Sequence, residues 1–418
     1  MKQRIRKLLY RARQPLRLPL AYIWRRLMFR TTVIAVTGSM GKTTTKDCLA
    51  AILARQAPTI KTQQNSNGDL GITRAILSLR PRHRYLVLEV GTDHPGQVKR
   101  MARLVKPDIA IVLAVKRNHL KVFTSPEEIA KEKAQLLKYV KRNGTVILND
   151  DDLLVKPMRT NSKNPPVLFG TTETAQIRAE HITSVWPQRL TFSLSKKGRS
   201  QNQWVNTQFV GNHWLASVLA AIAAAEVCGV SFQASASAIS TVKPFIARMQ
   251  PVKLTCGAIV IRDEYNGSQD SLIAMFEVLK AARAKRRILV FSDMSDVKSK
   301  PKKRQREIGF FAAKHTDMVV FLNEHGHHAK KAAIQAGMPP DQCHHIMSLQ
   351  QTAEVLKKEL REGDLVFLKG CATDHLSRIF HALLGEIGCW KSTCNYRITC
   401  DQCSELQANF DVQQINVQ

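Results

Sequence analysis

The stretch Val33-Ile-Ala-Val-Thr-Gly-Ser-Met-Gly-Lys-Thr-Thr-Thr45 decides the fold of this chain. Its apolar start predicts a buried strand, its two glycines predict a tight turn, and its end predicts the first turn of a helix. Such a turn binds phosphate, because backbone N–H groups at the helix N-terminus point at the phosphate oxygens. Lys42 adds a positive charge, and Thr43 offers a hydroxyl to Mg²⁺.

The same stretch departs from the common nucleotide-binding pattern at Val36, where that pattern has a glycine, so the loop is a shortened variant. The alternative interpretation is a glycine turn between strand and helix with no ligand. Gly41-Lys-Thr-Thr directly after a β-run favours ATP as the ligand. The loop residues predicted to contact ATP are Gly38, Ser39, Met40, Gly41, Lys42, Thr43 and Thr44.

The composition is that of a globular chain with an unusual charge. Its 418 residues are 44% hydrophobic, enough for the cores of roughly two or three domains. The excess of 63 Lys and Arg over 33 Asp and Glu gives a formal charge of +30, which indicates an anionic partner or surface. Five of the nine cysteines are scattered singly, which favours a reducing compartment over a secreted disulfide framework. We therefore predict a cytoplasmic protein.

Residues 1–30 form a basic arm, with ten Lys or Arg, no acid and interleaved apolar side chains. Pro15 and Pro19 interrupt it, and no apolar run reaches the roughly 18 residues of a spanning helix. No small-residue cleavage site follows an apolar core, so neither a membrane anchor nor a secretory signal is predicted. Two interpretations stay open. The arm lies on an anionic leaflet, peripheral at the inner face of the membrane, or it is a helix packed on the first domain with its charges in water.

Two later segments place further chemically active side chains close to the phosphate-binding loop. Tyr85-Leu-Val-Leu-Glu-Val-Gly91 is typical of a buried parallel strand, with Glu89 near its carboxyl end. Ligands of open α/β sheets bind at that edge, so Glu89 is a candidate Mg²⁺ ligand. The alternative is a structural pair between Glu89 and a lysine.

A third strand, over 108–114, leads to His119 and then to a helix. Ser125 as a cap and Pro126 at the first helical position mark the start of this helix. Lys133 lies at the edge of its apolar stripe. Taken alone, Lys133 is expected to extend to water and His119 to be structural. Beside a phosphate-binding loop and Glu89, both become candidates for a metal site.

The pattern along the chain predicts an α/β protein: a P-loop central domain with a parallel sheet, followed by a Rossmann-like C-terminal domain. Short apolar runs over 165–210 predict antiparallel strands and hairpins that cap the central sheet. Residues 214–228 predict a buried helix. We expect four segments: the basic arm 1–30, the ATP-binding domain 31–243, the second α/β domain 244–385 and a Cys-rich tail 386–418.

The tail carries four cysteines within fifteen residues, Cys389, Cys394, Cys400 and Cys403. In a reducing compartment, thiolates so close together predict a tetrahedral zinc site, with Cys400-Asp-Gln-Cys403 as its knuckle. The first pair is spaced more loosely than in common zinc ribbons. An iron–sulfur cluster, or free and redox-active thiols, are the alternatives.

At this point the ordered motifs can be compared with a known family. They are Thr37-Gly-Ser-Met-Gly-Lys-Thr-Thr-Thr, Asn65-Ser-Asn-Gly-Asp-Leu-Gly-Ile, Glu89-Val-Gly, His94-Pro-Gly, His119-Leu, Ala130-Lys-Glu-Lys-Ala-Gln-Leu-Leu, Val146-Ile-Leu-Asn-Asp-Asp-Asp, Gly211-Asn-His, Ala247-Arg-Met, Ile261-Arg-Asp-Glu-Tyr-Asn, Phe291-Ser-Asp-Met and Leu368-Lys-Gly. In order and spacing they resemble the motifs of the Mur ligases, the ATP-dependent amide-forming enzymes of peptidoglycan assembly. The resemblance spans about residues 33–385 and is strongest to the D-alanyl-D-alanine-adding branch.

The resemblance implies a role for each matching residue. Lys42 and Thr43 would hold the β- and γ-phosphates and one Mg²⁺, with Glu89 as a further ligand of that ion. His119 would bind a second metal ion. Lys133 matches the lysine that the family carbamylates, so that the carbamate acts as a carboxylate ligand. Lys42, His119 and Lys133 would be the catalytic residues.

The resemblance also implies contacts to the nucleotide from outside the loop. Asn149 and Asp150 fall in a region that the family places near the nucleotide. Arg248 and Asp263 would approach the ATP phosphates and ribose from the last domain.

The chain departs from the family at three places. Only the basic arm precedes the phosphate-binding loop where the family has a domain that binds a UDP-sugar, so recognition of UDP-muramoyl peptides in the usual way is not expected. Trp214 and Ser217 replace two asparagines that lie near adenine. Arg262, Glu264 and Gly267-Ser-Gln replace the usual Asp, Ser and Ala-Asn-Pro, so D-alanyl-D-alanine is not assumed as the incoming amine.

The prediction is therefore an ATP-dependent ligase that joins a carboxylate to an amine through an acyl phosphate, in cell-envelope or polymer biosynthesis. ATP and Mg²⁺ are the predicted cofactors, with zinc in the tail. The predicted substrates are an anionic or lipid-associated carboxylate and an amine. The alternative is a catalytically silent nucleotide-binding partner of an envelope-biosynthesis protein. Nucleic-acid binding is not favoured, because it rests on charge alone.

Overall fold

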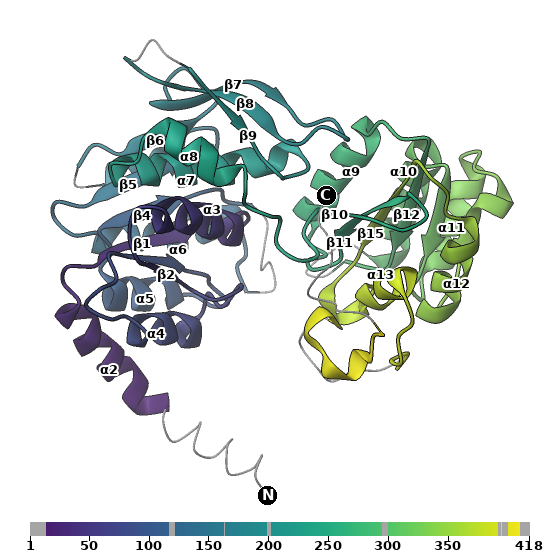
Figure 1. Cartoon of the computed structure of the whole chain (residues 1–418), viewed down its shortest axis with the longest axis horizontal. Coiled ribbons are helices and arrows are strands. Elements are labelled where there is room, and N and C mark those ends of the chain that lie inside the picture. The colour runs from purple at the N-terminus through teal and green to yellow at the C-terminus, as the bar shows by residue number, and fades with distance from the viewer. Residues whose placement is uncertain are drawn as a thin grey trace, which may run out of the picture. The chain divides into compact units, whose positions relative to one another are not determined.

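The computed structural model describes residues 14–116, 122–162, 164–198, 202–294, 300–391, 394 and 400–409. The chain divides into two compact units (Figure 1). Unit 1 comprises residues 1–182, 191–207 and 213–242, and unit 2 comprises residues 183–190, 208–212 and 243–418.

Within the described residues, unit 1 is built on a nine-stranded sheet that is parallel from β2 to β7 and ends in an antiparallel β8–β9 pair. In sheet order the strands are β2 (Thr59–Lys61), β3 (Tyr85–Glu89), β1 (Thr32–Thr37), β4 (Ile109–Val112), β5 (Thr145–Asn149), β6 (Val167–Gly170), β7 (Ile177–Thr183), β8 (Thr191–Lys196) and β9 (Gln203–Asn206). The strand that feeds the phosphate-binding loop, β1, lies between β3 and β4, inside the sheet. The carboxyl ends of these three strands therefore meet at one edge.

Helices cover both faces of this sheet (Figure 1). On one face lie α3 (Lys42–Ala54), α7 (Leu215–Val227) and α8 (Phe232–Ile239), and on the other α4 (Asp69–Leu77), α5 (Gln97–Val105) and α6 (Pro126–Ala134). Alternate residues of β1 serve the two faces, since Val33 and Ala35 pack in the core beneath α4, α5 and α6. The strand is buried from Val33 to Thr37, as expected for a parallel sheet covered on both sides.

The region 165–210 differs from the prediction of antiparallel hairpins. Strand β6 runs parallel to both of its neighbours, β5 and β7, so the prediction of antiparallel pairing is wrong for these two pairs. Only β8 and β9, of the pairs that the structure describes here, are antiparallel. Short alternating runs do not distinguish the two directions, because direction is decided by where the connecting chain crosses the sheet.

The start of α6 follows the local signals in the sequence. The Ser125 hydroxyl accepts a hydrogen bond from the backbone N–H of Glu128, and Pro126 is the first helical residue. The Glu128 carboxylate accepts from the N–H of Thr124, at 2.8 Å, rather than from the cap residue itself. This cap fixes the start of the helix that carries Lys133.

A helix from the basic arm, α2 (Gln14–Leu27), packs against α4 and α5. The Arg25 guanidinium donates to the carbonyl of Val105 at 2.9 Å and reaches the Asp108 carboxylate at 3.4 Å. The Trp24 indole donates to the carbonyl of Leu79. One of the two interpretations of the arm, a helix packed on the first domain, is thus realised from residue 14 onward. Across the described ranges, no helix is long and apolar enough to cross a membrane.

Unit 2 is a second α/β layer structure, with a six-stranded sheet among the residues described. Its strands, in sheet order, are β10 (Gln250–Lys253), β11 (Ile259–Asp263), β15 (Asp364–Lys369), β12 (Arg286–Phe291), β13 (Met318–Phe321) and β14 (Cys343–His345). Its helices are α9 (Gln269–Ala281), α10 (Pro301–His315), α11 (Gly326–Gln335), α12 (Leu349–Glu359) and α13 (Ser377–Leu384). Apart from β10, the strands are parallel, which confirms the predicted Rossmann-like alternation.

Candidate functional site

The phosphate-binding loop joins β1 to α3 with a backbone that only glycine adopts easily. Gly38 has φ +156° and Gly41, which caps α3, has φ +81°. A Cβ on Gly41 would lie 2.3 Å from the Ser217 hydroxyl oxygen. The Lys42 ammonium donates to the carbonyl of Gly38 at 2.8 Å, so the loop folds around its own lysine. The N–H groups of a first helical turn have no acceptor within their own helix, and in loops of this kind they bind phosphate.

A buried carboxylate connects this loop to the neighbouring strand. Glu89, at the carboxyl end of β3, is 1% exposed. It accepts a hydrogen bond from the Thr43 hydroxyl at 2.9 Å and another from the Asn67 side-chain amide at 2.9 Å. The Lys46 ammonium lies 4.0 Å from the same carboxylate. The structure thus brings Thr43 and Glu89 together, as the sequence predicted, and adds Asn67 and Lys46.

The Thr43–Glu89 pair fits Mg²⁺, because that ion takes oxygen ligands and is often bound through one or two protein groups together with substrate phosphates. A hydroxyl and a carboxylate oxygen already lie 2.9 Å apart here, beside the phosphate-binding loop. The structural alternative for Glu89, a pair with a lysine, is also realised in part through Lys46. The carboxylate therefore has a lysine neighbour in addition to the two donors that orient it.

Lys133, on α6, is 3% exposed rather than extended to water. Burial holds the pKa of its ammonium well below the ordinary value, and the charge of Lys42 lowers this pKa further, against an opposite effect from Glu132. A lysine in such surroundings carries a neutral amine over more of the pH range than a surface lysine does. The neighbouring Glu132 points elsewhere and accepts hydrogen bonds from the N–H groups of Gly96 and Val98, at the start of α5.

Two other predicted residues of unit 1 have different outcomes. His119 lies outside the described residues, so its predicted role as a metal ligand stays a prediction. Asn149 lies at the carboxyl end of β5, in the same sheet as the loop, and is buried. The next residue, Asp150, is bound by the Thr172 hydroxyl at 2.6 Å and by Lys156 at 3.2 Å. These contacts give Asp150 a local structural role.

Trp214 and Ser217, which replace the two asparagines that the family has near adenine, both belong to unit 1. The Ser217 hydroxyl donates to the carbonyl of Gly41 at 3.3 Å and so supports the phosphate-binding loop directly. Trp214 is 8% exposed and packs against the His213 ring at 4.6 Å. This tryptophan is therefore part of the core of the unit.

In unit 2, Arg248 and Asp263 occupy one neighbourhood. The Arg248 guanidinium lies over the rings of Tyr265 and Phe245, at 4.7 and 5.5 Å. Asp263, at the end of β11, pairs with Lys369 at 2.6 Å. Burial raises the pKa of Asp263, and Lys369 opposes this shift. That these residues approach ATP stays a prediction.

The family departures Arg262 and Glu264 have a structural explanation. The Arg262 guanidinium is fully buried and binds Glu264 at 2.6 Å and Asp401 of the tail at 2.6 and 3.0 Å. It also lies 4.2 Å from the Phe380 ring, and His381 lies 3.3 Å from Asp401. Removing one partner from a buried charge network of this kind lowers the free energy of unfolding by about 3–5 kcal/mol, because the other charge is left buried and unpaired. The altered residues thus hold the tail onto the β11 strand.

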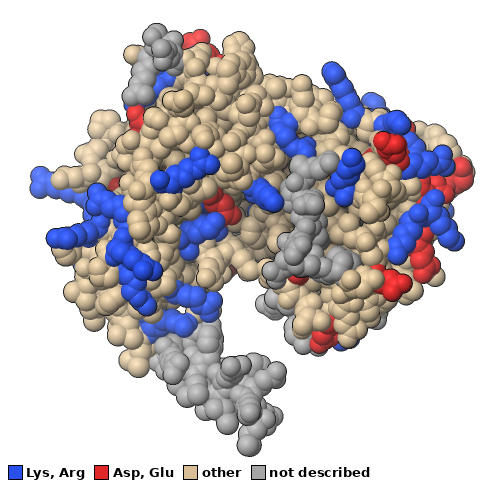
Figure 2. All heavy atoms as spheres, in the orientation of Figure 1, with Lys and Arg blue, Asp and Glu red and all other residues tan. Residues whose placement is uncertain are grey.

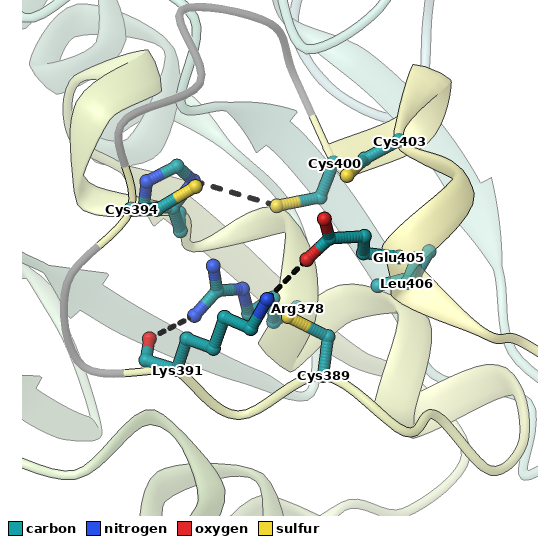
Figure 3. A pocket seen from close by; sticks show the side chains of 9 residues that line it. Arg378, Cys389, Lys391, Cys394, Cys400, Cys403, Glu405 and Leu406 are labelled. Atoms are coloured by element: carbon teal, nitrogen blue, oxygen red, sulfur yellow. Dashed lines mark hydrogen bonds and ion pairs between the residues drawn. The ribbon is translucent and has the colours of Figure 1, made fainter.

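The four tail cysteines line one small pocket of about 10 Å³. Figure 3 shows their side chains together with Arg378, Lys391 and Glu405. The Cys400 sulfur lies 3.5 Å from the His375 ring nitrogen, and burial raises the pKa of the Cys400 thiol to about 11. In the part of the chain that the structure describes, no three His, Cys, Asp or Glu side chains stand at the spacing of a metal site. The zinc prediction is therefore not confirmed.

Comparison with known proteins identifies the family. Residues 36–225 match the Mur ligase middle domain, and residues 247–372 match the Mur ligase glutamate ligase domain. The chain belongs to the Mur ligase family. As a Mur ligase it is an ATP-dependent enzyme that forms an amide bond between a carboxylate and an amine and releases ADP and phosphate.

Individual relatives of this Mur ligase agree with that assignment. It is 28% identical over 378 residues to the UDP-N-acetylmuramoyl-tripeptide–D-alanyl-D-alanine ligase of Mycobacterium tuberculosis, covering 86% of this chain and 74% of that one. It is 26% identical over 357 residues to the ligase of the same name from Bacillus subtilis, covering 85% and 76%. Among solved structures, a crystal structure of MurF from Acinetobacter baumannii has a TM-score of 0.80 at 25% identity, covering 88% of this chain and 79% of that one.

The sequence alone did not single out Asn67, Lys46 or Ser217 as contacts of the phosphate-binding loop. Asn67 lies in the polar stretch 63–71, which contains two glycines. The position of this stretch after a short strand was the one sequence feature that could have indicated a contact with the site. Lys46 also donates to the carbonyl of Gln64 in that stretch. Helix α3 and the stretch 63–71 therefore contact each other as well as Glu89. A pattern of residue types does not reveal such contacts, because they depend on how the loop folds back.

We expect Gly41→Ala to weaken ATP binding about tenfold or more. The added Cβ meets the Ser217 oxygen, and the left-handed backbone costs about 1–2 kcal/mol for a non-glycine residue. Gly229→Ala is the matched control, since Gly229 has φ +85° in the same unit and nothing within 4 Å of an added Cβ. Titration of each variant with ATP measures the effect. Equal affinities for the two variants would contradict the proposed contact.

Proposed function

We propose that this Mur ligase activates an envelope-associated carboxylate as an acyl phosphate and then joins it to an amine. The observation that carries the proposal is the Thr43–Glu89–Asn67 cluster beside the phosphate-binding loop, together with the buried α6 lysine, Lys133, whose pKa is lowered by burial and by the charge of Lys42 in that loop. Each of these groups has a task in phosphoryl transfer to a carboxylate, which is a poor electrophile until it is phosphorylated.

In the first step the loop positions ATP. Backbone N–H groups at the start of α3 and the Lys42 ammonium hold the phosphates and offset the charge that develops as the γ-phosphoryl leaves. Thr43 and Glu89 would hold Mg²⁺, which neutralises charge on the β- and γ-phosphates when bound. Asn67 donates to Glu89 and so fixes the orientation of its carboxylate.

In the second step an amine attacks the acyl phosphate, phosphate leaves from the tetrahedral adduct and an amide remains. The relatives from Mycobacterium tuberculosis and Bacillus subtilis are ligases of UDP-N-acetylmuramoyl-tripeptide and D-alanyl-D-alanine. We propose a carboxylate from the same cell-envelope chemistry, with an acid-bearing or lipid-associated body. The formal charge of +30 supports an anionic acceptor. Arg262 binds Asp401 of the tail and Glu264 binds Arg262, so these two departures from the family do not identify the amine.

A screen for ADP release tests this function. Purified full-length protein with ATP and Mg²⁺ is mixed with pairs of envelope carboxylates and amino acids or dipeptides, and the products are followed by mass spectrometry. We expect release of ADP that depends on both substrates, and a mass increase equal to the amine minus water. Lys42→Ala should abolish both, while Lys357→Ala, a change at an exposed position of α12 in unit 2, should leave both intact. ATP binding without release for any pair would instead support a silent nucleotide-binding partner.

We also propose that Lys133 is carbamylated. Its burial lowers the pKa of the ammonium and so favours the neutral amine, which reacts with CO₂ to give a carbamate and a released proton; the carbamate serves as a carboxylate. Protein equilibrated with ¹³C-labelled bicarbonate should show a carbamate carbon resonance that disappears as the pH is lowered, because protonation removes the nucleophile. Lys133→Met should lose the resonance, and Lys131→Met, at an exposed position on the same helix, should keep it. Persistence of the signal in Lys133→Met would refute this assignment.

The tail cysteines are proposed as a structural zinc site. The four cysteines line one pocket, and Arg378 and Lys391 at its wall would offset the negative charge of four thiolates. Because the described side chains do not stand at metal-site spacing, zinc binding would draw them together. Elemental analysis of the purified protein should find about one zinc per chain, with loss in Cys400→Ser and no loss in Cys256→Ser, an exposed single cysteine. Absence of both zinc and iron would leave the cysteines as free thiols and overturn the proposal.

A further inference from the structure

The exposed side of α2 carries a continuous apolar stripe. Leu16, Leu20, Ile23 and Leu27 are 63, 54, 56 and 57% exposed, and their spacing of four, three and four residues places them along one line of the helix. Phe29, just beyond the helix, is 71% exposed. Among the described residues, half of the strongly exposed large apolar side chains, seven of fourteen, lie between residues 16 and 29. Such a concentration indicates a surface that is covered by a partner.

The opposite side of α2 already packs against the rest of unit 1, so the apolar stripe is not the side of the helix that faces the core. Ala21 is fully buried and Met28 nearly so, both within the core beneath the sheet. The Arg25 guanidinium and the Trp24 indole donate to backbone carbonyls of α5 and of the segment after α4. The helix is therefore held with its apolar stripe outward.

Positive charge surrounds the stripe. A groove of about 640 Å³ lies between Leu18, Pro19 and Tyr22 of α2 and Gly96, Lys99 and Arg103 at α5. Lys99, Arg103 and Arg30 are exposed, and Figure 2 shows Lys and Arg gathered over this part of unit 1, with few acidic side chains among them. No acidic residue occurs in the sequence before Asp47.

We propose that α2 docks unit 1 on an anionic phospholipid surface. The stripe enters the boundary between headgroups and acyl chains, and the surrounding Lys and Arg side chains contact the headgroup phosphates. The positive charge favours a lipid surface over a second copy of the chain, because two such helices face to face would bring like charges together. The described residues that carry these charges are Arg17, Arg26, Arg30, Lys99 and Arg103. A lipid surface offers the opposite sign over the whole patch. Docking of α2 would place the enzyme at a membrane surface, whichever carboxylate and amine it joins.

Sedimentation with vesicles tests the docking surface. Full-length protein is mixed with vesicles of phosphatidylcholine alone or of phosphatidylcholine with phosphatidylglycerol, at low and high salt. We expect binding only to the anionic vesicles, and weaker binding at high salt. Leu20→Ser combined with Ile23→Ser should weaken it at least about tenfold, and Lys99→Gln combined with Arg103→Gln should reduce its salt dependence. Ile273→Ser combined with Phe310→Ser, at equally exposed apolar positions of unit 2, is the matched control.

Three results would overturn the docking surface. Equal binding of the stripe variant and the control would show that α2 does not contact lipid. Equal binding to neutral and anionic vesicles would remove the role of charge. A concentration-dependent dimer without vesicles, dissociated by the stripe variant in sedimentation velocity, would assign the stripe to a second copy. Circular dichroism and ATP affinity of the stripe variant check that unit 1 stays folded, and ADP release without vesicles reports the ligase reaction separately.

Discussion

The buried Glu89 carboxylate is the interaction that holds the phosphate-binding loop of unit 1 to the neighbouring strand and loop. It is buried at the end of β3, and its two oxygens accept hydrogen bonds from the first turn of α3 and from the loop before α4. A buried carboxylate is costly unless such donors surround it. The same contacts that make its burial tolerable also fix the phosphate-binding loop beside an oxygen-rich pair of side chains. Stability and catalytic geometry therefore have one origin here.

The sequence was sufficient for those parts of the site that local rules determine. A β-run followed by Gly38 to Thr45 predicts strand, turn and helix because glycine conformations and helix N-termini are local properties, and the parallel α/β fold was confirmed. Glu89 was placed correctly because the carboxyl ends of parallel strands share an edge. The parallel direction of β6 and β7 and the partners of Glu89 in the 63–71 stretch were not predicted, because both depend on where loops cross the sheet.

Arg262 illustrates the limit of reading a substitution from its position in a motif. In the sequence it is a departure next to a predicted nucleotide contact, which suggested altered amine selection. In the structure its guanidinium is buried between Glu264 and Asp401, 139 residues away, and Phe380 covers it. A contact across that sequence separation leaves no local trace. Asp401 also lies between Cys400 and Cys403, so the charge network and the cysteine pocket restrain the same short segment.

Helix α5 is held at both ends by charged side chains from other helices. At its start the Glu132 carboxylate accepts from two N–H groups, and at its end Arg25 and Arg26 donate to the last carbonyls. Both arrangements match the polarity of the helix dipole. Glu132 is the neighbour of Lys133, and Arg25 belongs to α2. Helix α5 therefore links α2, bound at its C-terminal end, to α6, bound at its N-terminal end, through charged hydrogen bonds.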